Sequence, residues 1–481
     1  MPLRRVAILL LAAACGGAAD QATSAPSSPN TPSPVTSTGV VYVRDDTTAY
    51  LPDFLPASGF AGAQVTLETS ASTTSATGAF SVTGGGAVSR NFDALQATAG
   101  GWMTTWFPWY TAEAAKPIPL ALYPEATATP RPGFLKGVYY WDGGGFVAGF
   151  MRNGWTGTTA DRVRTVMNGN MMGALDELDV VAADTAANTV SMQRAPSAMS
   201  ATTLRTFVNE AHSRGMKFIF ELEISARTTA ALGAVPASKN AFWDAYFAAW
   251  TPLLVETTAM ARDAGVDYFI VDGLKRYLSH LPIGRTQTLM AALRATGFKG
   301  QLGYQGAYQG ATTNGNELAT ATPGFIDLFD FVSVYVASAV TPGPGETLGR
   351  AYSRKRIKSD VQTFVTSVSG WPKPTIINGA VPSVHGGVSS TEYIEPCLGC
   401  GSVALQRTRD YQQQADFYEA IAEAINASPI NKITGLMSFG YMWGGDMTED
   451  PNGPGSNAFD RSASVRGKPA EAVLSWWFKR W

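Results

Sequence analysis

VDYFIVDGLKRY, residues Val266–Tyr277, is the stretch around which this chain is organised. A short apolar run typical of a buried strand leads to Asp272 and Gly273, and a basic, aromatic segment follows. Strand-like runs alternate with amphipathic helical stretches on both sides of it, which predicts a parallel sheet with crossover helices. We expect the stretch to be the fourth strand of a (β/α)8 TIM barrel, with Asp272 at the end where such barrels do chemistry.

Eight segments have the composition of barrel strands, and the helical period appears between them. The predicted strands are Gly137–Trp141, Leu178–Ala182, Met216–Ile224, Val266–Asp272, Gly300–Gln305, Phe329–Val336, Pro374–Ala380 and Ile433–Trp443. The clearest predicted helices are Thr203–Arg214, Phe242–Ala264, Leu348–Ser367 and Thr408–Asn426. An open, doubly wound sheet is the alternative, but the glycines after Tyr140 lack the spacing of a phosphate-binding turn.

The N-terminus has the features of an export signal. Arg4 and Arg5 precede the apolar run Val6–Ala14, which is far shorter than the ~20 residues of a membrane-spanning helix. The small residues before Cys15 resemble a bacterial lipoprotein signal, in which that cysteine is lipidated and becomes the new N-terminus. This resemblance implies a signal peptide over residues 1–15, a membrane anchor on Cys15, and location at the outer membrane or cell surface. A protein that is simply secreted is the alternative.

The residues after Cys15 divide into three parts. Residues 16–38 are rich in Pro, Ser and Thr and predict a disordered tether, because they cannot bury enough apolar surface to fold. Residues 39–126 have frequent turn residues and alternating strand-like segments, which predicts a small all-β sandwich. The barrel is expected over residues 133–481, after the linker Thr129–Pro132.

The composition bears on the partners of the protein. Lys and Arg number 36 and Asp and Glu 38, so the near-neutral charge argues against a nucleic acid. The 12 Trp and 17 Tyr suit either a large core or stacking on sugar rings. The pair Cys397 and Cys400 predicts a disulfide clip, since no further Cys or His pair lies nearby to complete a zinc site. We expect a monomer with no cofactor and no resident metal.

The sandwich region resembles the carboxypeptidase regulatory-like modules in Gly62–Leu67 and Ser75–Val82. Such modules are spacers or stability modules without catalytic residues. Trp102, Trp106, Trp109 and Tyr110 crowd one part of this region. They are expected either to pack against the barrel or to extend a sugar-binding surface.

Four segments of the barrel region resemble the β-mannanase-type TIM-barrel glycoside hydrolases of the large retaining clan A. They are Phe242–Phe247 with Ala264–Phe269, Tyr411–Ala420, Gly435–Asp446 and the closing GKPAEAVL of Gly467–Leu474. The resemblance implies a polysaccharide or oligosaccharide substrate and two catalytic glutamates after the fourth and seventh strands. Leu274 and Asn378 stand at those two positions, so the two-glutamate mechanism cannot be transferred to this chain.

Other carboxylates end neighbouring strands. Alternation along FIFELEIS puts Glu221 and Glu223 on one face with Ile219, and Asp272 ends the next strand. One interpretation is structural: Glu221 forms a salt bridge, for instance to Lys275 or Arg276, and Asp272 caps a turn. A second makes Glu223 and Asp272 a displaced catalytic pair, with Glu221 beside it. A third is a metal-assisted site that includes His280 or His385.

The remaining predicted mouth residues offer stacking faces or hydrogen-bond partners to a sugar. The predicted substrate-binding residues are Trp141, Asp142, Tyr304, Gln305, Tyr335, Asn378, His385, Tyr441, Trp443 and Asp446. An esterase is disfavoured because the chain has no G-x-S-x-G elbow and only three His. The leading hypothesis is therefore an exported glycoside-hydrolase-like protein acting on polysaccharide at the cell surface. The alternative is a catalytically inactive barrel that binds carbohydrate or assists surface assembly.

Overall fold

The computed structural model describes most of the chain from residue 34 onward. The described residues are 34–51, 55–56, 58–84, 91–109, 116–140, 155–194, 198–224, 235–271, 278–309, 321–341, 343, 350–389, 408–441 and 461–481. At Glu177 and Glu223 the description covers the backbone and not the side chain. The signal with Cys15, residues 16–33 of the predicted tether, and the pair Cys397 and Cys400 lie outside the described residues. Residues 35–38, which the sequence assigned to the disordered tether, instead form the start of strand β1 (Val35–Val43) and pair with residues 81–84.

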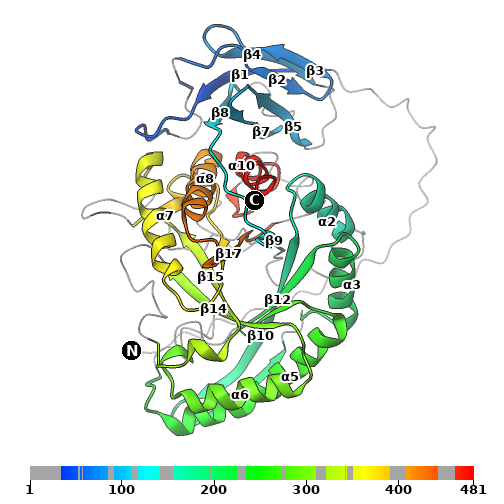
Figure 1. The fold of residues 1–481 in the computed structure, drawn as a ribbon, viewed down its shortest axis with the longest axis vertical. Helices are drawn as coiled ribbons and strands as arrows, with labels where there is room; N and C mark the ends of the chain where they lie inside the picture. The colour runs from blue at the N-terminus through cyan, green and yellow to red at the C-terminus, as the bar shows by residue number, and fades with distance from the viewer. Residues whose placement is uncertain are drawn as a thin grey trace, which may run out of the picture.

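An N-terminal sheet domain precedes the barrel (Figure 1). Its strands are β1 (Val35–Val43), β2 (Gln64–Leu67), β3 (Ser70–Thr73), β4 (Ala79–Gly84), β5 (Asn91–Thr98), β6 (Trp102–Met103), β7 (Thr105–Trp109) and β8 (Ile118–Pro124). They form two four-stranded sheets, with orders β4-β1-β8-β6 and β3-β2-β5-β7. Alternate residues of both sheets, such as Val65, Val82 and Leu120, share one buried core, because successive side chains of a strand point to opposite faces.

The tryptophans of this domain are largely engaged in packing. Trp109 is 1% exposed and donates from Nε1 to Ser37 Oγ at 2.7 Å, while Trp106 is 7% exposed. Trp102 is half-buried and meets the ring of Phe60 edge to face at 5.4 Å. Tyr110 lies outside the described residues. Trp106 and Trp109 are therefore too buried to form a sugar-binding surface.

The second part of the chain is a closed barrel of eight parallel strands, which confirms the predicted fold class. Its strands are β9 (Leu135–Tyr140), β10 (Met171–Asp184), β12 (Lys217–Ile224), β13 (Tyr268–Val271), β14 (Gln301–Gln309), β15 (Phe331–Ser338), β16 (Thr375–Gly379) and β17 (Ile433–Ser438). Each strand pairs with the next, and β17 pairs with β9 and β9 with β10 to close the barrel. An antiparallel strand, β11 (Thr189–Arg194), lengthens β10 into a hairpin.

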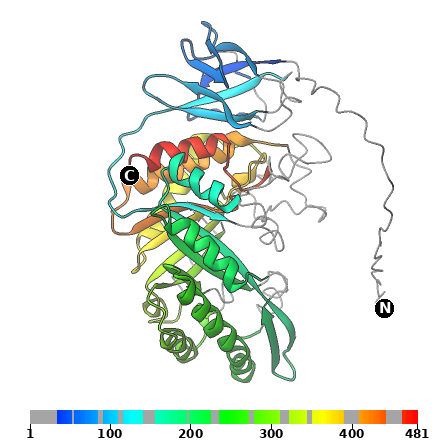
Figure 2. The same cartoon turned by 90° about the vertical axis from the view of Figure 1, so that its right-hand side faces the viewer.

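Helices flank the barrel strands (Figures 1 and 2). They are α2 (Trp155–Thr165), α3 (Ala201–His212), α5 (Asn240–Ala264), α6 (Ile283–Ala295), α7 (Arg354–Ser369), α8 (Tyr411–Ala427) and α10 (Pro469–Phe478), with short 3-10 turns at Leu278–His280, Ile326–Leu328 and Gly387–Ser389. Ser200, Ser353 and Asp410 cap the starts of α3, α7 and α8 by accepting backbone N–H groups. No helix in these described ranges is long and apolar enough to cross a membrane.

The second barrel strand differs from its prediction. The sequence suggested Leu178–Ala182, whereas β10 begins at Met171 and pairs with β9 and β12 before it reaches Leu178. Gly173, Asp176 and Glu177 interrupt the apolar run, so this part of the strand has no clear local signal. The predicted segment is instead largely the part of β10 that pairs with β11.

Apolar side chains cover both faces of the barrel wall. Inward residues, among them Leu135, Ile219, Ile270 and Phe331, fill the barrel, and outward residues pack against the helices. Gly303 takes an inward position where a Cβ would lie 2.2 Å from the ring of Phe331, so the ring fills the space that a side chain would need. The part of the barrel around Gly303 and Phe331 is therefore a packed core and not a pore.

The sheet domain lies against the outside of the barrel, next to α8 and α10 (Figures 1 and 2). A charged cluster joins the two parts: Arg354 of α7 bonds Glu419 of α8 and also reaches Asp46, at 2.7 Å, beyond β1. Lys358 adds a second cation, 2.6 Å from Glu423. The buried pair of Arg354 and Glu419 within the barrel is thus linked to the sheet domain through Asp46, whose side chain is 54% exposed.

Candidate active site

The alternation predicted for the third barrel strand is present in β12. Phe218, Phe220 and Leu222 join the core that faces the helices, and Ile219 joins the core inside the barrel. Glu221 shares the inward side and is 0% exposed. A carboxyl group is therefore enclosed within the barrel, where desolvation is costly unless other polar groups or a ligand compensate it.

Three further polar side chains occupy inward positions on β14, β15 and β16. Gln305 is 1% exposed and Asn378 and Ser333 are 0% exposed. Ser333 is the register partner of Gln305, and its Oγ accepts a hydrogen bond of 2.8 Å from Asn378 Nδ2. Within the described parts of the chain, no donor reaches the amide oxygens Oε1 of Gln305 and Oδ1 of Asn378. These oxygens can accept hydrogen bonds from water or from a ligand that carries hydroxyl groups.

An aromatic group stands on the same inner wall. Tyr335 is half-buried, pairs in register with Asn378, and meets the ring of Phe439 edge to face at 5.1 Å. The ring centroid of Phe439 in turn lies 5.8 Å from that of Tyr139. The sequence interpretation included Tyr335 but missed Tyr139 and Phe439, whose inward parity on β9 and beyond β17 is the signal that would have indicated them.

Tyr304 and Tyr441 do not lie at the predicted sugar site. Tyr304 is 0% exposed on the outer side of β14, packed against Phe325 and Phe329 at 5.0 and 5.3 Å. Tyr441 is also 0% exposed, and its hydroxyl donates to Glu471 Oε1 at 2.6 Å. Burial, followed by the nearby charge of Glu471, raises the pKa of Tyr441 well above its ordinary value. Tyr304 faces the helices because it has the opposite parity to the inward Gly303 and Gln305. Tyr441 lies beyond the end of β17 and after Gly440, whose φ is +74°, so the alternation of the strand no longer decides its direction.

His385 lies in the loop after β16. Its Nδ1 is 3.5 Å from Oδ2 of Asp410, and its backbone N–H donates to the carbonyl of Thr408. Asp410 also accepts the backbone N–H groups of Gln412 and Gln413 at the start of α8. His385 is thus placed beside a helix cap, while His280 is exposed on a 3-10 turn. In the described segments, no three His, Cys, Asp or Glu residues come together as a metal-binding group would require.

Several predicted site residues lie outside the described residues. They are Trp141, Asp142, Asp272, Leu274, Trp443 and Asp446, together with Lys275 and Arg276. For Glu223 the backbone places the residue at the C-terminal end of β12, beyond Glu221. The proposed pair of Glu223 and Asp272 therefore remains a prediction.

Glu177 is a candidate that the sequence interpretation missed. The register of β10 and β12 pairs Glu177 with Glu223, and Leu175 with Glu221. Residues paired in this way on parallel strands share a face of the sheet, so the backbone puts the positions of Glu177 and Glu223 side by side. The signal was available only once β10 was known to start at Met171, because the predicted strand began at Leu178 and did not include Glu177.

No family model matches the sequence, and no curated protein matches it. Solved structures do match the fold, and their class is that of TIM-barrel glycoside hydrolases. A structure of a GH113 β-1,4-mannanase matches with a TM-score of 0.50 at 15% identity, over 72% of this chain and 99% of the mannanase. The GH113 β-mannanase AaManA from Alicyclobacillus acidocaldarius, solved in complex with ManMIm, gives 0.50 at 17% identity, over 72% and 97%. At such low identity the similarity establishes a glycoside-hydrolase-like fold.

Proposed function

We propose that this protein is an exported glycoside-hydrolase-like enzyme that acts on the glycosidic bonds of a polysaccharide at the cell surface. The observation that carries the proposal is the polar interior of the barrel below the C-terminal ends of its strands. Glu221, Gln305 and Asn378 are all at least 99% buried there, where TIM barrels ordinarily hold branched apolar side chains. Burial of so many polar groups is costly, and a ligand rich in hydroxyl groups would offset that cost.

The proposed catalytic groups are the carboxyls of Glu223 and Asp272, at the ends of adjacent strands β12 and β13. Glycoside hydrolysis needs one carboxyl group that donates a proton to the leaving oxygen and a second that acts as nucleophile or base. Carboxylates held close together in a site of low water content cannot all carry charge, which is how one becomes the acid and another the base. Glu221 is enclosed below, and the backbone register puts position 177 beside position 223, so Glu177 is a further candidate.

The amide groups are proposed to recognise the sugar. The free oxygens of Gln305 and Asn378 accept hydrogen bonds from sugar hydroxyls, and Tyr335 offers an aromatic edge beside them. Because structural neighbours are described as β-1,4-mannanases, mannan is the first polysaccharide to test. Lipid anchoring through Cys15 would hold the protein at the membrane surface where such polymers are met.

A second candidate is a barrel that binds carbohydrate without cleaving it. Asn378, which the family resemblance places at the nucleophile position, is fully buried in β16 and hydrogen-bonded to Ser333. An amide at that point can bind a hydroxyl but cannot form a glycosyl ester. This observation favours binding without turnover if Glu223 and Asp272 do not act together.

The test is to incubate the purified protein with mannans, glucans, galactans and amino-sugar polymers while measuring both new reducing ends and binding. Turnover that disappears in the double variant Glu223→Gln, Asp272→Asn supports the proposed pair. The matched control is Glu256→Gln, which changes an exposed carboxylate on α5. Turnover that survives the double substitution excludes the pair, and binding without any turnover identifies the inactive barrel.

A further inference from the structure

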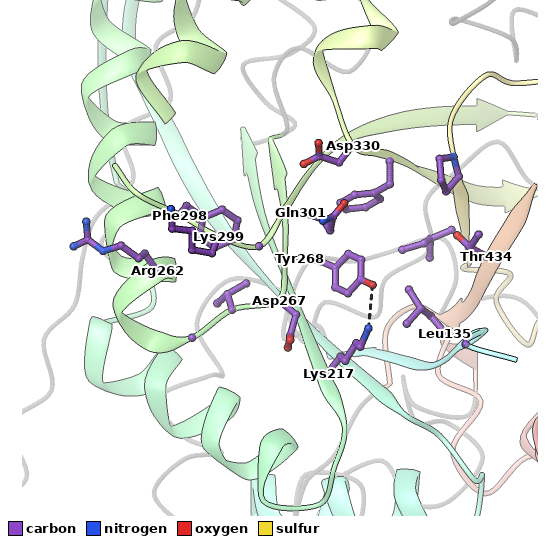
Figure 3. Close-up of a pocket in the computed structure, with 17 residues that line it drawn as sticks. Leu135, Lys217, Arg262, Asp267, Tyr268, Phe298, Lys299, Gln301, Asp330 and Thr434 are labelled. Atoms are coloured by element: carbon purple, nitrogen blue, oxygen red, sulfur yellow. Dashed lines mark hydrogen bonds between the residues drawn. The ribbon is translucent and has the colours of Figure 1, made fainter. Parts of the chain in front are cut away.

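A cavity of about 690 Å³ opens at the end of the barrel opposite the candidate active site (Figure 3). Its lining includes Leu135, Lys217, Tyr268, Gln301 and Phe331, each the first residue of its barrel strand. The volume is within the range of pockets that hold small organic ligands. It is therefore a space separate from the candidate active site, and the proposed reaction does not use it.

Both acidic side chains in the lining already have polar partners. Asp267 Oδ2 is 2.9 Å from His212 Nε2 and also accepts the backbone N–H of Phe218 at 2.8 Å. Asp330 is bonded to Arg294 and accepts the backbone N–H of Leu302 at 2.7 Å. Within the described residues, neither carboxylate forms an ion pair with a lysine of the cavity.

Two lysines of the lining lack such a partner. Lys217 and Lys299 are both exposed, and no carboxylate in the described ranges forms an ion pair with either. Lys217 Nζ instead lies 3.4 Å from the hydroxyl of Tyr268, and this ring is held edge to face against Phe331 at 5.4 Å. Figure 3 shows Lys217 directed at Tyr268, with Gln301 on the other side of the ring. The ammonium, the phenol and the amide of Gln301 are hydrogen-bond donors gathered around one part of the cavity.

We propose that this cavity binds an anionic saccharide, with Lys217 and Tyr268 donating to its carboxylate or phosphate group and Gln301 to a neighbouring hydroxyl. An ammonium and a hydroxyl that donate to one anionic group form charge-assisted hydrogen bonds, which are stronger than neutral ones. Lys299 adds positive potential at the rim. The choice of a saccharide rests on the proposed function, whereas the anionic group rests on the charges of the cavity alone.

The experiment is titration calorimetry on the full chain with four probes: oligogalacturonate, mannose 6-phosphate, mannohexaose and inorganic phosphate. We expect at least one charged sugar to bind, and Lys217→Gln to weaken that binding about tenfold or more. Tyr268→Phe should weaken it less, and added salt should weaken it further. Lys355→Gln, an exposed lysine in the first turn of α7, is the matched control and should have no effect.

Failure of both charged sugars to bind, or equal binding by Lys217→Gln, would overturn the inference. Inorganic phosphate that binds as tightly as the sugar phosphate would overturn the saccharide part, since a bare anion would then suffice. The same titrations on the double variant Glu223→Gln, Asp272→Asn separate this site from the proposed reaction. Binding of charged sugars that depends on Lys217 in a protein with no polysaccharide turnover leaves the cavity assignment standing and removes the enzymatic proposal.

Discussion

The guanidinium of Arg44, at the end of β1, meets the carboxylate of Asp416, in α8 of the barrel, at 2.6 Å with side-chain exposures of 1% and 0%. Two further contacts of 3.1 Å from Arg44 Nε make the pair a forked one, and Tyr123 donates to the same carboxylate at 2.6 Å. The residues are 372 positions apart in the chain. Sheet domain and barrel are thus joined by an ion pair from which water is excluded.

Removal of one member of this pair should be strongly destabilising. Arg44→Ala leaves the charge of Asp416 buried without a counter-ion, and we expect a loss of about 3–5 kcal/mol in the free energy of unfolding. Arg262→Ala, which breaks the exposed pair with Asp263, should lower the free energy of unfolding far less, because water screens this pair. Urea unfolding measures both. If Arg44→Ala unfolds like Arg262→Ala, the pair does not join the two parts of the molecule.

The cluster around Arg354 should make stability depend on pH. Three carboxylates, Asp46, Glu419 and Glu423, face two cations, Arg354 and Lys358, so the cluster has one negative charge in excess. Burial, opposed by Arg354 but reinforced by Glu423, raises the pKa of Glu419 from its ordinary 4.5 to about 8. The folded protein therefore binds the extra proton more tightly than the unfolded chain, and this contribution to stability is present below pH 4.5 and is lost as pH rises through 8.

Glu419→Gln tests this effect, because glutamine mimics the protonated carboxyl at every pH. We expect the urea midpoint of the variant to vary less between pH 5 and pH 8.5 than that of the unmodified protein, in the window on either side of the raised pKa of about 8. Asp360→Asn, in an exposed pair with Arg356 on α7, is the control for the loss of one carboxylate. The prediction is contradicted if the urea midpoint of the unmodified protein rises from pH 5 to pH 8.5 while that of Glu419→Gln does not. The pH dependence of stability would then have the opposite sign.

Gln305→Leu should separate stability from ligand binding. Because the amide oxygen of Gln305 is buried with no donor in the described residues, its removal should leave the free energy of unfolding within about 1 kcal/mol or increase it. Carbohydrate affinity should fall about tenfold, since a sugar hydroxyl loses its acceptor. Thermal unfolding and calorimetry with the polysaccharide identified in the panel check the two parts. Gln362→Leu on the exposed side of α7 is the control.

Equal affinity of Gln305→Leu and the unmodified protein would show that the ligand does not reach the barrel interior. A large loss of stability would show instead that the amide is satisfied within the protein.

Glu177→Gln should lower turnover by about 10²-fold if the register partner of Glu223 takes part in proton transfer or in the charge crowding that supports it. Binding of the intact polysaccharide should change little, because the substitution keeps the size and shape of the side chain and one acceptor oxygen. Initial rates at saturating substrate measure the effect of Glu177→Gln on turnover. Its effect on binding is measured by adding Glu177→Gln to the double variant Glu223→Gln, Asp272→Asn and comparing the affinity with that of the double variant alone. Unchanged turnover would place Glu177 outside the reaction, whereas loss of binding would make it a substrate contact.

Much of the barrel could be predicted from the chain because its signals are local. The alternation of FIFELEIS puts Glu221 inside and Phe220 outside, since a strand has a period of two wherever it lies in the fold. The same local rule failed in three places. β10 starts at Met171, Tyr304 has outward parity, and Tyr441 lies past the end of β17, where the backbone turns at Gly440. The bounds of a strand and the face that it turns inward depend on the neighbouring strands. The sequence alone does not specify which strands those are.

The sequence by itself determined the order of strands and helices, the barrel, and the presence of a sheet domain before it. Only the tertiary structure decided that Arg44 meets Asp416, that Glu177 stands beside Glu223, and that Lys217 and Tyr268 share a cavity at the far end of the barrel. The physical reason is that periodicity acts between near neighbours in the chain. Register, burial and ion pairing are instead set by residues that only the closed fold brings together.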